Sequence, residues 1–368
     1  MSIRIVFVIP ALEHTGAAKQ LALLASRLPR DEFDVHVCAL ESGGPQKKLL
    51  DDAGVPVTVI GKRRACDPAA LWRLGRVIKE IQPDIAHTWL FAGNTYGRWA
   101  ARRNGVKHII ASERGVDRWK TWGHLAIDRF LARSTKHIVV NSPAVQQFYV
   151  GKGIAADRFE VIANGVEVDT APPVLSREEF LARLDVPNDA RVIAVIGRLT
   201  VQKQLKDAIW ATDLLKRARD DAHVVIIGDG PQRWRLTRYR DQIEIDDRVH
   251  FLGERDDVPE LMPHFDCVWL ASSCEGQSNA IMEAMAASVP VVASDIPANR
   301  ELVESGETGY LVPLGDRAHL AQWTNVLLDD PDLTKRIGLA GQAKMREQFS
   351  VERMVDDHAQ LYRELVDG

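Results

Sequence analysis

Features that would place a chain outside the cytosol or on nucleic acid are missing from this sequence. Its 368 residues contain four cysteines and no CxxC pair, which argues against a disulfide framework and against a structural zinc site. No segment approaches the roughly 18 apolar residues of a membrane span, and the apolar start MSIRIVFVIP is too short for a signal peptide. There is no zinc-finger spacing, RNA-binding aromatic signature or long basic run. We therefore expect a cytosolic protein with reduced thiols that binds no nucleic acid.

The glycine fingerprint of dinucleotide-binding domains is missing too. It would place GxGxxG directly after the first strand and an acidic residue about 20 residues later. The first predicted strand, residues 3–9, is followed instead by PALEHTGAAKQ. Gly16 in this segment still stands at an expected helix start, where a glycine lets a phosphate or a sugar approach the backbone closely.

The composition is that of an ordinary globular protein, with charge divided unevenly along the chain. Hydrophobic residues make up 46% and charged residues 27%, and the length suits two or three domains. Residues 1–170 carry 24 basic and 17 acidic side chains, whereas residues 171–368 carry 23 and 34. This asymmetry indicates two domains with different partners, and the basic half would suit an anionic partner or a lipid surface. Composition drift between two domains explains it equally well.

Short apolar runs alternate with longer amphipathic stretches in both halves of the chain. Runs that are apolar almost throughout are expected for strands covered on both faces by crossover helices. Seven predicted strands lie in the first half, at residues 3–9, 34–40, 55–60, 84–89, 108–112, 137–142 and 159–163. Six lie in the second half, at 191–197, 222–229, 248–253, 266–272, 289–294 and 309–314. The pattern predicts an α/β protein with two Rossmann-like, doubly wound parallel sheets.

A stretch without apolar periodicity separates the two series of strands. ANGVEVDTAPPVLSREE contains turn residues and two adjacent prolines, which are typical of a linker. We place a first domain at residues 1–168, a linker at 169–188 and a second domain at 189–348. Two such domains create a cleft, and the carboxyl edges of open α/β sheets are where ligands bind.

The segment CEGQSNAIMEAMA, residues 274–286, joins the end of a predicted strand to a helix. Ser278 can cap this helix, and the amides at a helix start form a phosphate site. The amides concerned belong to Asn279, Ala280 and Ile281. Glu283, one turn into the helix, could accept both hydroxyls of a ribose, and Glu275 could bind a sugar beyond the phosphates. Taken alone, Glu283 is better explained as a solvated helix residue.

Two other turns carry residues suited to a phosphorylated ligand. Arg198 and Lys203 follow strand 191–197, and positive side chains at the carboxyl edge of a sheet suit a diphosphate. Gly228 and Gly230, in the sequence GDGP, stand where the backbone must bend tightly or approach a ligand. Each signal is weak alone, because a solvated loop explains the first and an ordinary turn the second.

Taken together, these motifs resemble glycosyltransferase family 4, whose members are retaining enzymes of the GT-B fold. The motifs that carry the resemblance are GAAKQL (16–21), ANGVEVD (163–169), GRLTVQK (197–203), GDGP (228–231), EGQSNAIMEAMA (275–286) and FSVERMVDDHAQLYREL (349–365). The most specific element is the pair Glu275 and Glu283, with seven residues between them. The resemblance implies two Rossmann-like domains facing a cleft, an acceptor-binding one and a nucleotide-sugar-binding one. It also implies that the helix at 349–368 crosses back to the first domain.

The family pattern assigns roles to individual residues. Arg198 and Lys203 would grip the donor diphosphate and stabilise the charge growing on the leaving group. Glu275 would contact the donor sugar and Glu283 the ribose. Other donor contacts would come from Gly16, Gly230, Arg255, Ser278, Asn279, Ala280 and Ile281. The resemblance implies no metal and no cofactor, since the nucleotide-sugar is a co-substrate.

Two positions depart from the family pattern. Gln277 replaces an aromatic residue that many relatives carry after the E-G pair, which puts the base or sugar preference in doubt. Arg114, in ASERG, stands where a histidine is often found, and its guanidinium could contact a donor hydroxyl, a phosphate or an anionic acceptor. His87 fits a structural or supporting role better than a catalytic one, although contact with acceptor or sugar stays open.

The segment RGVDRWKTWGHLAIDRF, residues 114–130, combines basic residues with Trp119 and Trp122. Such residues on one helix face can rest on an anionic membrane. The tryptophans could instead pack against neighbouring helices, and we prefer that interpretation.

The resemblance extends to a subgroup that builds capsule, lipopolysaccharide or exopolysaccharide, through HTWLFAGNTYGRWAARR and ASERG. We therefore predict a retaining hexosyltransferase that uses a UDP- or GDP-sugar and a glycan or lipid-linked acceptor, in the cytoplasm or at the inner face of the membrane. A nucleotide-sugar 2-epimerase of the same fold and a non-catalytic GT-B binding protein remain alternatives. The sequence does not identify the nucleotide, the sugar, the acceptor or the oligomeric state.

Overall fold

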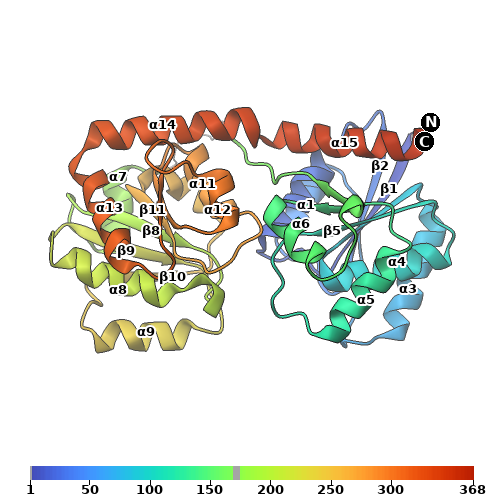
Figure 1. The fold of residues 1–368 in the computed structure, drawn as a ribbon, viewed down its shortest axis with the longest axis horizontal. Helices are drawn as coiled ribbons and strands as arrows, with labels where there is room; N and C mark the ends of the chain where they lie inside the picture. The colour runs from blue at the N-terminus through green and yellow to red at the C-terminus, as the bar shows by residue number, and fades with distance from the viewer. Residues whose placement is uncertain (1, 169–174) are drawn as a thin grey trace. The chain divides into compact units, whose positions relative to one another are not determined.

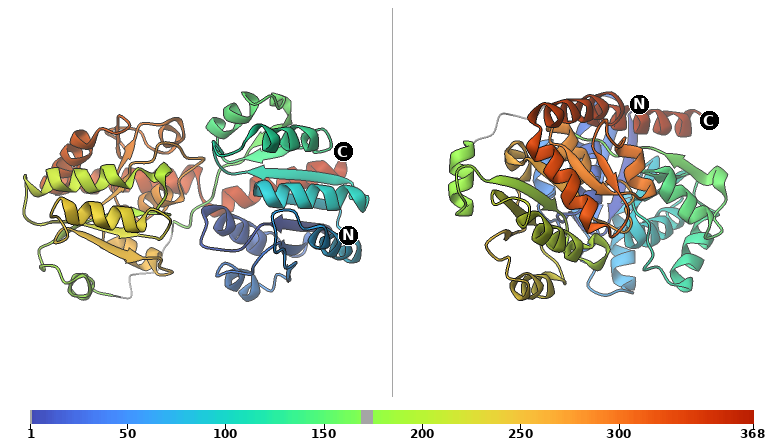
Figure 2. Two further views of the ribbon diagram at one scale, coloured as in Figure 1. Left: turned by 90° about the horizontal axis from the view of Figure 1, so that it is seen from below. Right: turned by 60° about the vertical axis from the view of Figure 1, so that its left-hand side comes forward.

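The computed structural model describes residues 2–168 and 175–368 and divides into two compact units. The first unit comprises the chain up to Gly165 together with Val351–Gly368, and the second comprises Val166–Ser350. Each unit is a parallel sheet with helices on both of its faces (Figures 1 and 2).

The sheet of the first unit has seven strands in the order β3-β2-β1-β4-β5-β6-β7. These strands are β1 (Ile3–Ile9), β2 (Phe33–Ala39), β3 (Val57–Val59), β4 (Ile85–Trp89), β5 (His108–Glu113), β6 (Ile138–Val140) and β7 (Phe159–Val161). The helices are α1 (Gly16–Arg27), α2 (Lys47–Asp52), α3 (Pro68–Ile81), α4 (Leu90–Arg103), α5 (Trp122–Ala132), α6 (Pro143–Val150) and α15 (Val351–Asp367). The strand order reverses between β1 and β4, which pair in parallel through Val6 and Ala86.

The sheet of the second unit has six strands in the order β10-β9-β8-β11-β12-β13. They are β8 (Arg191–Ile196), β9 (Ala222–Ile227), β10 (Val249–Gly253), β11 (Cys267–Leu270), β12 (Val291–Ser294) and β13 (Tyr310–Val312). The helices are α7 (Arg177–Leu184), α8 (Leu205–Lys216), α9 (Arg233–Gln242), α10 (Val258–Leu261), α11 (Asn279–Ala286), α12 (Pro297–Leu302), α13 (Arg317–Asp329) and α14 (Pro331–Gln348). The order reverses between β8 and β11. The predicted fold class, two doubly wound parallel sheets, is therefore confirmed.

Helix α15 belongs to the first unit although the chain reaches it only after the second (Figure 1). Met354, Ala359 and Leu361 of this helix join the same buried cluster as Phe7 of β1 and Leu24 of α1. Residues 351–368 thus complete a core that residues 3–162 begin.

The predicted linker at 169–188 is wrong over its second part. Residues 169–174 lie outside the described residues, but α7 follows, and Phe180 and Leu181 are buried in the core of the second unit. The helix begins with a capping box, in which the Ser176 hydroxyl accepts from the Glu179 amide while the Glu179 carboxylate accepts from the Ser176 amide. The capping signal stands in SREE, directly after the turn-rich segment whose composition predicts a linker.

Candidate functional site

The strand ends at the reversal point of the second sheet bring two predicted site residues into contact. Lys203, after β8, donates through Nζ to Glu275 Oε1, after β11, at 2.7 Å. The side chains are 19% and 10% exposed, so the ion pair is largely shielded from water. The backbone around it joins the two loops, because the Ser273 amide donates to the Gln202 carbonyl at 2.9 Å. This is the location where open α/β sheets hold ligands.

Glycines let the loop after β9 pack directly against the loop after β8. A Cβ on Gly228, whose φ is +132°, would lie 2.2 Å from the Gly197 carbonyl oxygen. A Cβ on Gly230 would lie 2.6 Å from the Leu199 carbonyl oxygen. The Leu199 amide also donates to the Asp229 carbonyl, at 2.9 Å. In this structure the predicted donor residue Gly230 therefore serves backbone packing.

Helix α11 starts shortly after Glu275, which pairs with Lys203, and it carries the remaining residues of the 274–286 motif. Ser278 caps the helix, accepting through Oγ from the Ile281 amide at 3.4 Å. That amide is therefore already used, and the amides of Asn279 and Ala280 precede it in the first turn. Glu283 lies one turn further along and is partly exposed.

Two residues of the second unit that the sequence predicts to bind the nucleotide-sugar take no part in the Lys203–Glu275 ion pair. Arg198 is exposed in the loop after β8, and its guanidinium makes no hydrogen bond or ion pair within residues 2–168 and 175–368. Arg255 pairs with Asp257 through two hydrogen bonds of 2.7 and 2.5 Å, which raise the pKa of Arg255. In this arrangement the Arg255 guanidinium is directed to Asp257.

In the first unit, Gly16 begins α1 and is exposed. Thr15 caps that helix by accepting from the Ala18 amide at 3.2 Å. Gly16 follows β1, which borders the reversal point of the first sheet.

His87 is completely buried and holds α15 against the sheet. Its Nδ1 lies 2.7 Å from the Tyr362 hydroxyl and its Nε2 lies 2.7 Å from Ser112 Oγ. Burial lowers the pKa of His87 well below its ordinary value, and the positive charge of Arg114 acts in the same direction. Both ring nitrogens of His87 therefore lie within hydrogen-bonding distance of side chains of the first unit.

Arg114 is a buried cation that contacts no carboxylate among residues 2–168 and 175–368. Its guanidinium lies 4.0 Å above the Trp89 ring, and its terminal nitrogens lie 3.3 Å from Asn164 Oδ1, 3.4 Å from Ser112 Oγ and 3.4 Å from His358 Nε2. Its Nε is buried without a partner among the described residues. Burial lowers the pKa of Arg114 to about 9, which leaves it charged at neutral pH.

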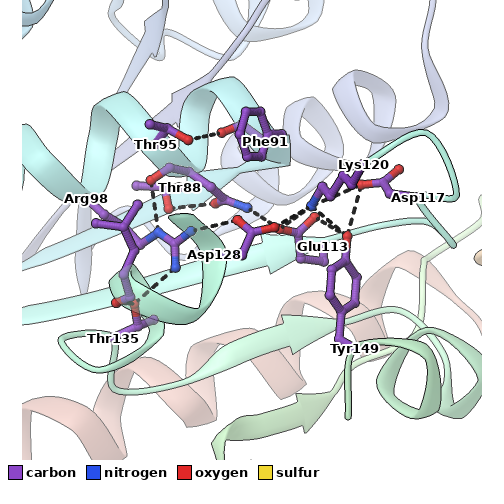
Figure 3. A network of polar contacts seen from close by, with 12 residues as sticks. Thr88, Phe91, Thr95, Arg98, Glu113, Asp117, Lys120, Asp128, Thr135 and Tyr149 are labelled. Atoms are coloured by element: carbon purple, nitrogen blue, oxygen red, sulfur yellow. Dashed lines mark hydrogen bonds and ion pairs between the residues drawn. The ribbon is translucent and has the colours of Figure 1, made fainter. Parts of the chain in front are cut away.

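Next to Arg114 lies a buried charge network that the sequence did not predict (Figure 3). Lys120 Nζ contacts Glu113 at 3.1 Å, Asp128 at 3.0 Å, Asp117 at 3.2 Å and the Tyr149 hydroxyl at 2.7 Å. Burial opposes the charge on Lys120, but the three carboxylates outweigh it and raise the pKa of Lys120. The sequence shows Lys120 only as one of several basic residues beside tryptophans, and its partners come from β5, the loop after it, α5 and α6.

The preferred interpretation of the tryptophans as packed residues is wrong for Trp122, which is 84% exposed. Trp119 is 58% exposed, although its ring meets Phe91 and His124 edge-on. Lys120, which the sequence grouped with them, is buried instead.

Comparison with known protein families decides the identity of the chain. Residues 14–170 match the model described as Glycosyltransferase Family 4, and residues 176–344 match that of Glycosyl transferases group 1. The chain belongs to glycosyltransferase family 4. The fold of this family 4 glycosyltransferase is GT-B, as the sequence predicts.

Curated relatives match this glycosyltransferase over nearly its full length. The UDP-Gal:alpha-D-GlcNAc-diphosphoundecaprenol alpha-1,3-galactosyltransferase of Escherichia coli is 25% identical, over 92% of this chain and 91% of the relative. The putative glycosyltransferase EpsD of Bacillus subtilis is 26% identical, over 91% of this chain and 90% of the relative. The structure of Anabaena Alr3699/HepE in complex with UDP-glucose superposes with a TM-score of 0.88 at 24% identity, covering 98% of this chain and 100% of that one. Among the described helices of the family 4 chain, none is long and apolar enough to cross a membrane.

Proposed function

We propose that this glycosyltransferase moves a hexose-type sugar from a UDP- or GDP-sugar to a glycan or lipid-linked acceptor, retaining the anomeric configuration and using no metal. The observation that carries the proposal is the Lys203–Glu275 ion pair at the reversal point of the second sheet. It joins a cation suited to phosphate and a carboxylate suited to sugar hydroxyls at one place.

The chemistry follows from these positions. Lys203, joined by the exposed Arg198, neutralises the charge that grows on the diphosphate as the bond between the sugar C1 and the phosphate oxygen breaks. The acceptor oxygen forms a bond to C1 on the same face, and its proton passes to the departing phosphate. Glu275 accepts from sugar hydroxyls, Glu283 from the ribose, and the first turn of α11 receives the phosphate.

The pairing of Lys203 with Glu275 gives the site a defined geometry. Each side chain holds the other in place before a donor arrives, so less side-chain freedom is lost when the donor binds. The close approach of Gly228 and Gly230 to the backbone of Gly197 and Leu199 packs the loop that leads to Lys203 against the loop after β9.

In the first unit we assign Arg114 to an anionic group of the acceptor or donor and His87 to its support. A buried guanidinium without a carboxylate partner is costly, and an arriving anion would offset that cost. His87 and Arg114 share the Ser112 hydroxyl, so His87 orients the residue that Arg114 contacts.

Relatives support a role in cell-surface polysaccharide synthesis. The Escherichia coli relative is named for UDP-Gal and a diphosphoundecaprenol-linked acceptor. A relative of Rhizobium meliloti, 25% identical over 79% of this chain, is named as a lipopolysaccharide core biosynthesis glycosyltransferase.

A donor screen tests the proposal. Each common nucleotide-sugar is incubated with the purified protein, and release of nucleotide diphosphate is measured. We expect slow release from one donor, lost in Lys203→Ala and Glu283→Ala and kept in Arg235→Ala, a control at an exposed position of α9. Conversion of the donor to an isomer, or absence of binding and release across the panel, would overturn the proposal.

A further inference from the structure

Helix α5 exposes large apolar side chains to solvent while its carboxylate is buried against the protein. Trp122, Phe130 and Ile127 are 84%, 48% and 38% exposed, whereas Asp128 is 2% exposed. At 100° per residue, Asp128 points away from the direction shared by Trp122 and Phe130. Leu131 and Ala132 are buried as expected for a surface helix, but an ordinary surface helix does not also expose large apolar residues while it buries a charge.

Buried ion pairs fix this orientation. Asp128 accepts from Lys120 at 3.0 Å and from Arg98 of α4 at 3.4 Å (Figure 3). Rotating α5 to bury Trp122 would pull Asp128 from both cations and leave buried charges unpaired, which is costly. The outward position of the tryptophan is therefore held by the fold and is not a loose surface conformation.

Arginines surround the exposed apolar residues. Arg129 and Arg133 are exposed and share the outward side of α5, and Arg118 is exposed just before the helix. Between residues 118 and 136 the only acidic side chain is that of the buried Asp128. We name the set Trp122, Ile127, Arg129, Phe130 and Arg133 the α5 face.

We propose that the α5 face is a docking surface for an anionic lipid bilayer. An aromatic residue on a short helix lying in the interface buries its ring at the headgroup level, while arginines beside it meet anionic headgroups. The charge of the face complements such a surface, and its amphipathic pattern fits a helix that lies on a membrane without crossing it. The inference rests on the proposed function, because docking would bring the first unit to a lipid-linked acceptor.

Vesicle flotation with the full chain tests this docking. We expect binding to phosphatidylglycerol-containing vesicles at low salt, and weaker binding to phosphatidylcholine vesicles and at high salt. The variant Trp122→Ser/Phe130→Ser should lose at least about tenfold in partitioning, since two exposed rings are removed. Arg129→Gln and Arg133→Gln should each lose roughly fivefold on anionic vesicles.

Helix α9 supplies the matched control. Trp234 is 67% exposed among the arginines of this helix, but no other large hydrophobic residue of α9 is exposed. Trp234→Ser should float like the unchanged protein. Loss of flotation in Trp234→Ser equal to that in Trp122→Ser/Phe130→Ser would contradict the assignment to the α5 face.

Three other results would overturn the inference. They are failure of the unchanged protein to float with anionic vesicles at low salt, flotation of Trp122→Ser/Phe130→Ser at the unchanged level, and a concentration-dependent dimer that this variant abolishes in sedimentation. The dimer would identify a second copy of the chain as the occupant. Donor-dependent nucleotide release without vesicles should be unchanged in this variant, so failure of docking and failure of the proposed transferase are distinguishable.

Discussion

Acid should release α15 from the first unit through His358. This residue is completely buried, with Nε2 3.4 Å from Arg114 and Nδ1 2.8 Å from the Met354 carbonyl. The neighbouring His87 ring and the Tyr362 hydroxyl bring no negative charge to it. Burial, reinforced by the charge of Arg114, lowers the pKa of His358 to about 3, against an ordinary value near 6.5.

The sign and size of the effect follow from linkage. A histidine that is held neutral when folded and titrates near 6.5 when exposed stabilises the docked helix fully above pH 6.5 and progressively less as the pH falls toward 3. pH 5 lies about 1.5 units below the pKa of the exposed histidine and above that of the buried one, so about 2 kcal/mol of this stability is lost there. His87, whose pKa is also lowered by burial, adds to the loss in the same direction.

Hydrogen exchange of peptides from α15, corrected for the intrinsic pH dependence of exchange, measures this loss between pH 7.5 and 5. In His358→Gln the loss of stability between pH 7.5 and 5 should be smaller by about 2 kcal/mol, because glutamine does not titrate. His319→Gln, at an exposed position of α13, is the control and should behave as the unchanged protein. An unchanged pH dependence in His358→Gln would refute the reasoning.

Three further results are expected from single substitutions. Gly228→Ala should lower the free energy of unfolding of the second unit by about 2 kcal/mol or more, measured by urea titration, because its Cβ would strike the facing backbone. The control Gly54→Ala, at φ +70° with open space around it, should cost only about 1 kcal/mol. Lys120→Met should cost about 3–5 kcal/mol in the first unit by leaving its buried carboxylates unpaired, whereas the exposed Lys107→Met should leave the melting temperature in place. Arg198→Ala should slow donor-dependent nucleotide release about 10²–10³-fold without changing the melting temperature, since the side chain is exposed.

The sheets were predictable from sequence because burial on both faces makes each strand a continuous apolar run. Residues 3–9 and 191–196 form strands almost as predicted, and each of the apolar runs that lie between them in the chain also contains a strand. The linker prediction failed because turn composition was weighed above the local capping signal at Ser176 and Glu179.

The site was only partly predictable, because motif residues are local but their contacts are not. Lys203 and Glu275 were placed on two strand ends by sequence, and the parallel order of β8 and β11 brings them together. Lys120 and Arg114 gave no sign of burial, because their contacts depend on tertiary packing. Lys120 meets Asp128 of α5 and Tyr149 of α6, and Arg114 meets His358 of α15. A basic residue in a polar segment is typically exposed, and only tertiary packing reverses that expectation.

The assignment of α15 to the first unit affects the order in which the protein can be completed on the ribosome. By the time Gly165 has been made, every strand of the first sheet has been synthesised, but the surface that receives Leu361 and Tyr362 is still uncovered. Synthesis must continue through the whole of Val166–Ser350 before those residues emerge. We therefore expect the first unit to spend the synthesis time of the second with an exposed apolar groove, open to chaperones and, in chains that stop early, to degradation.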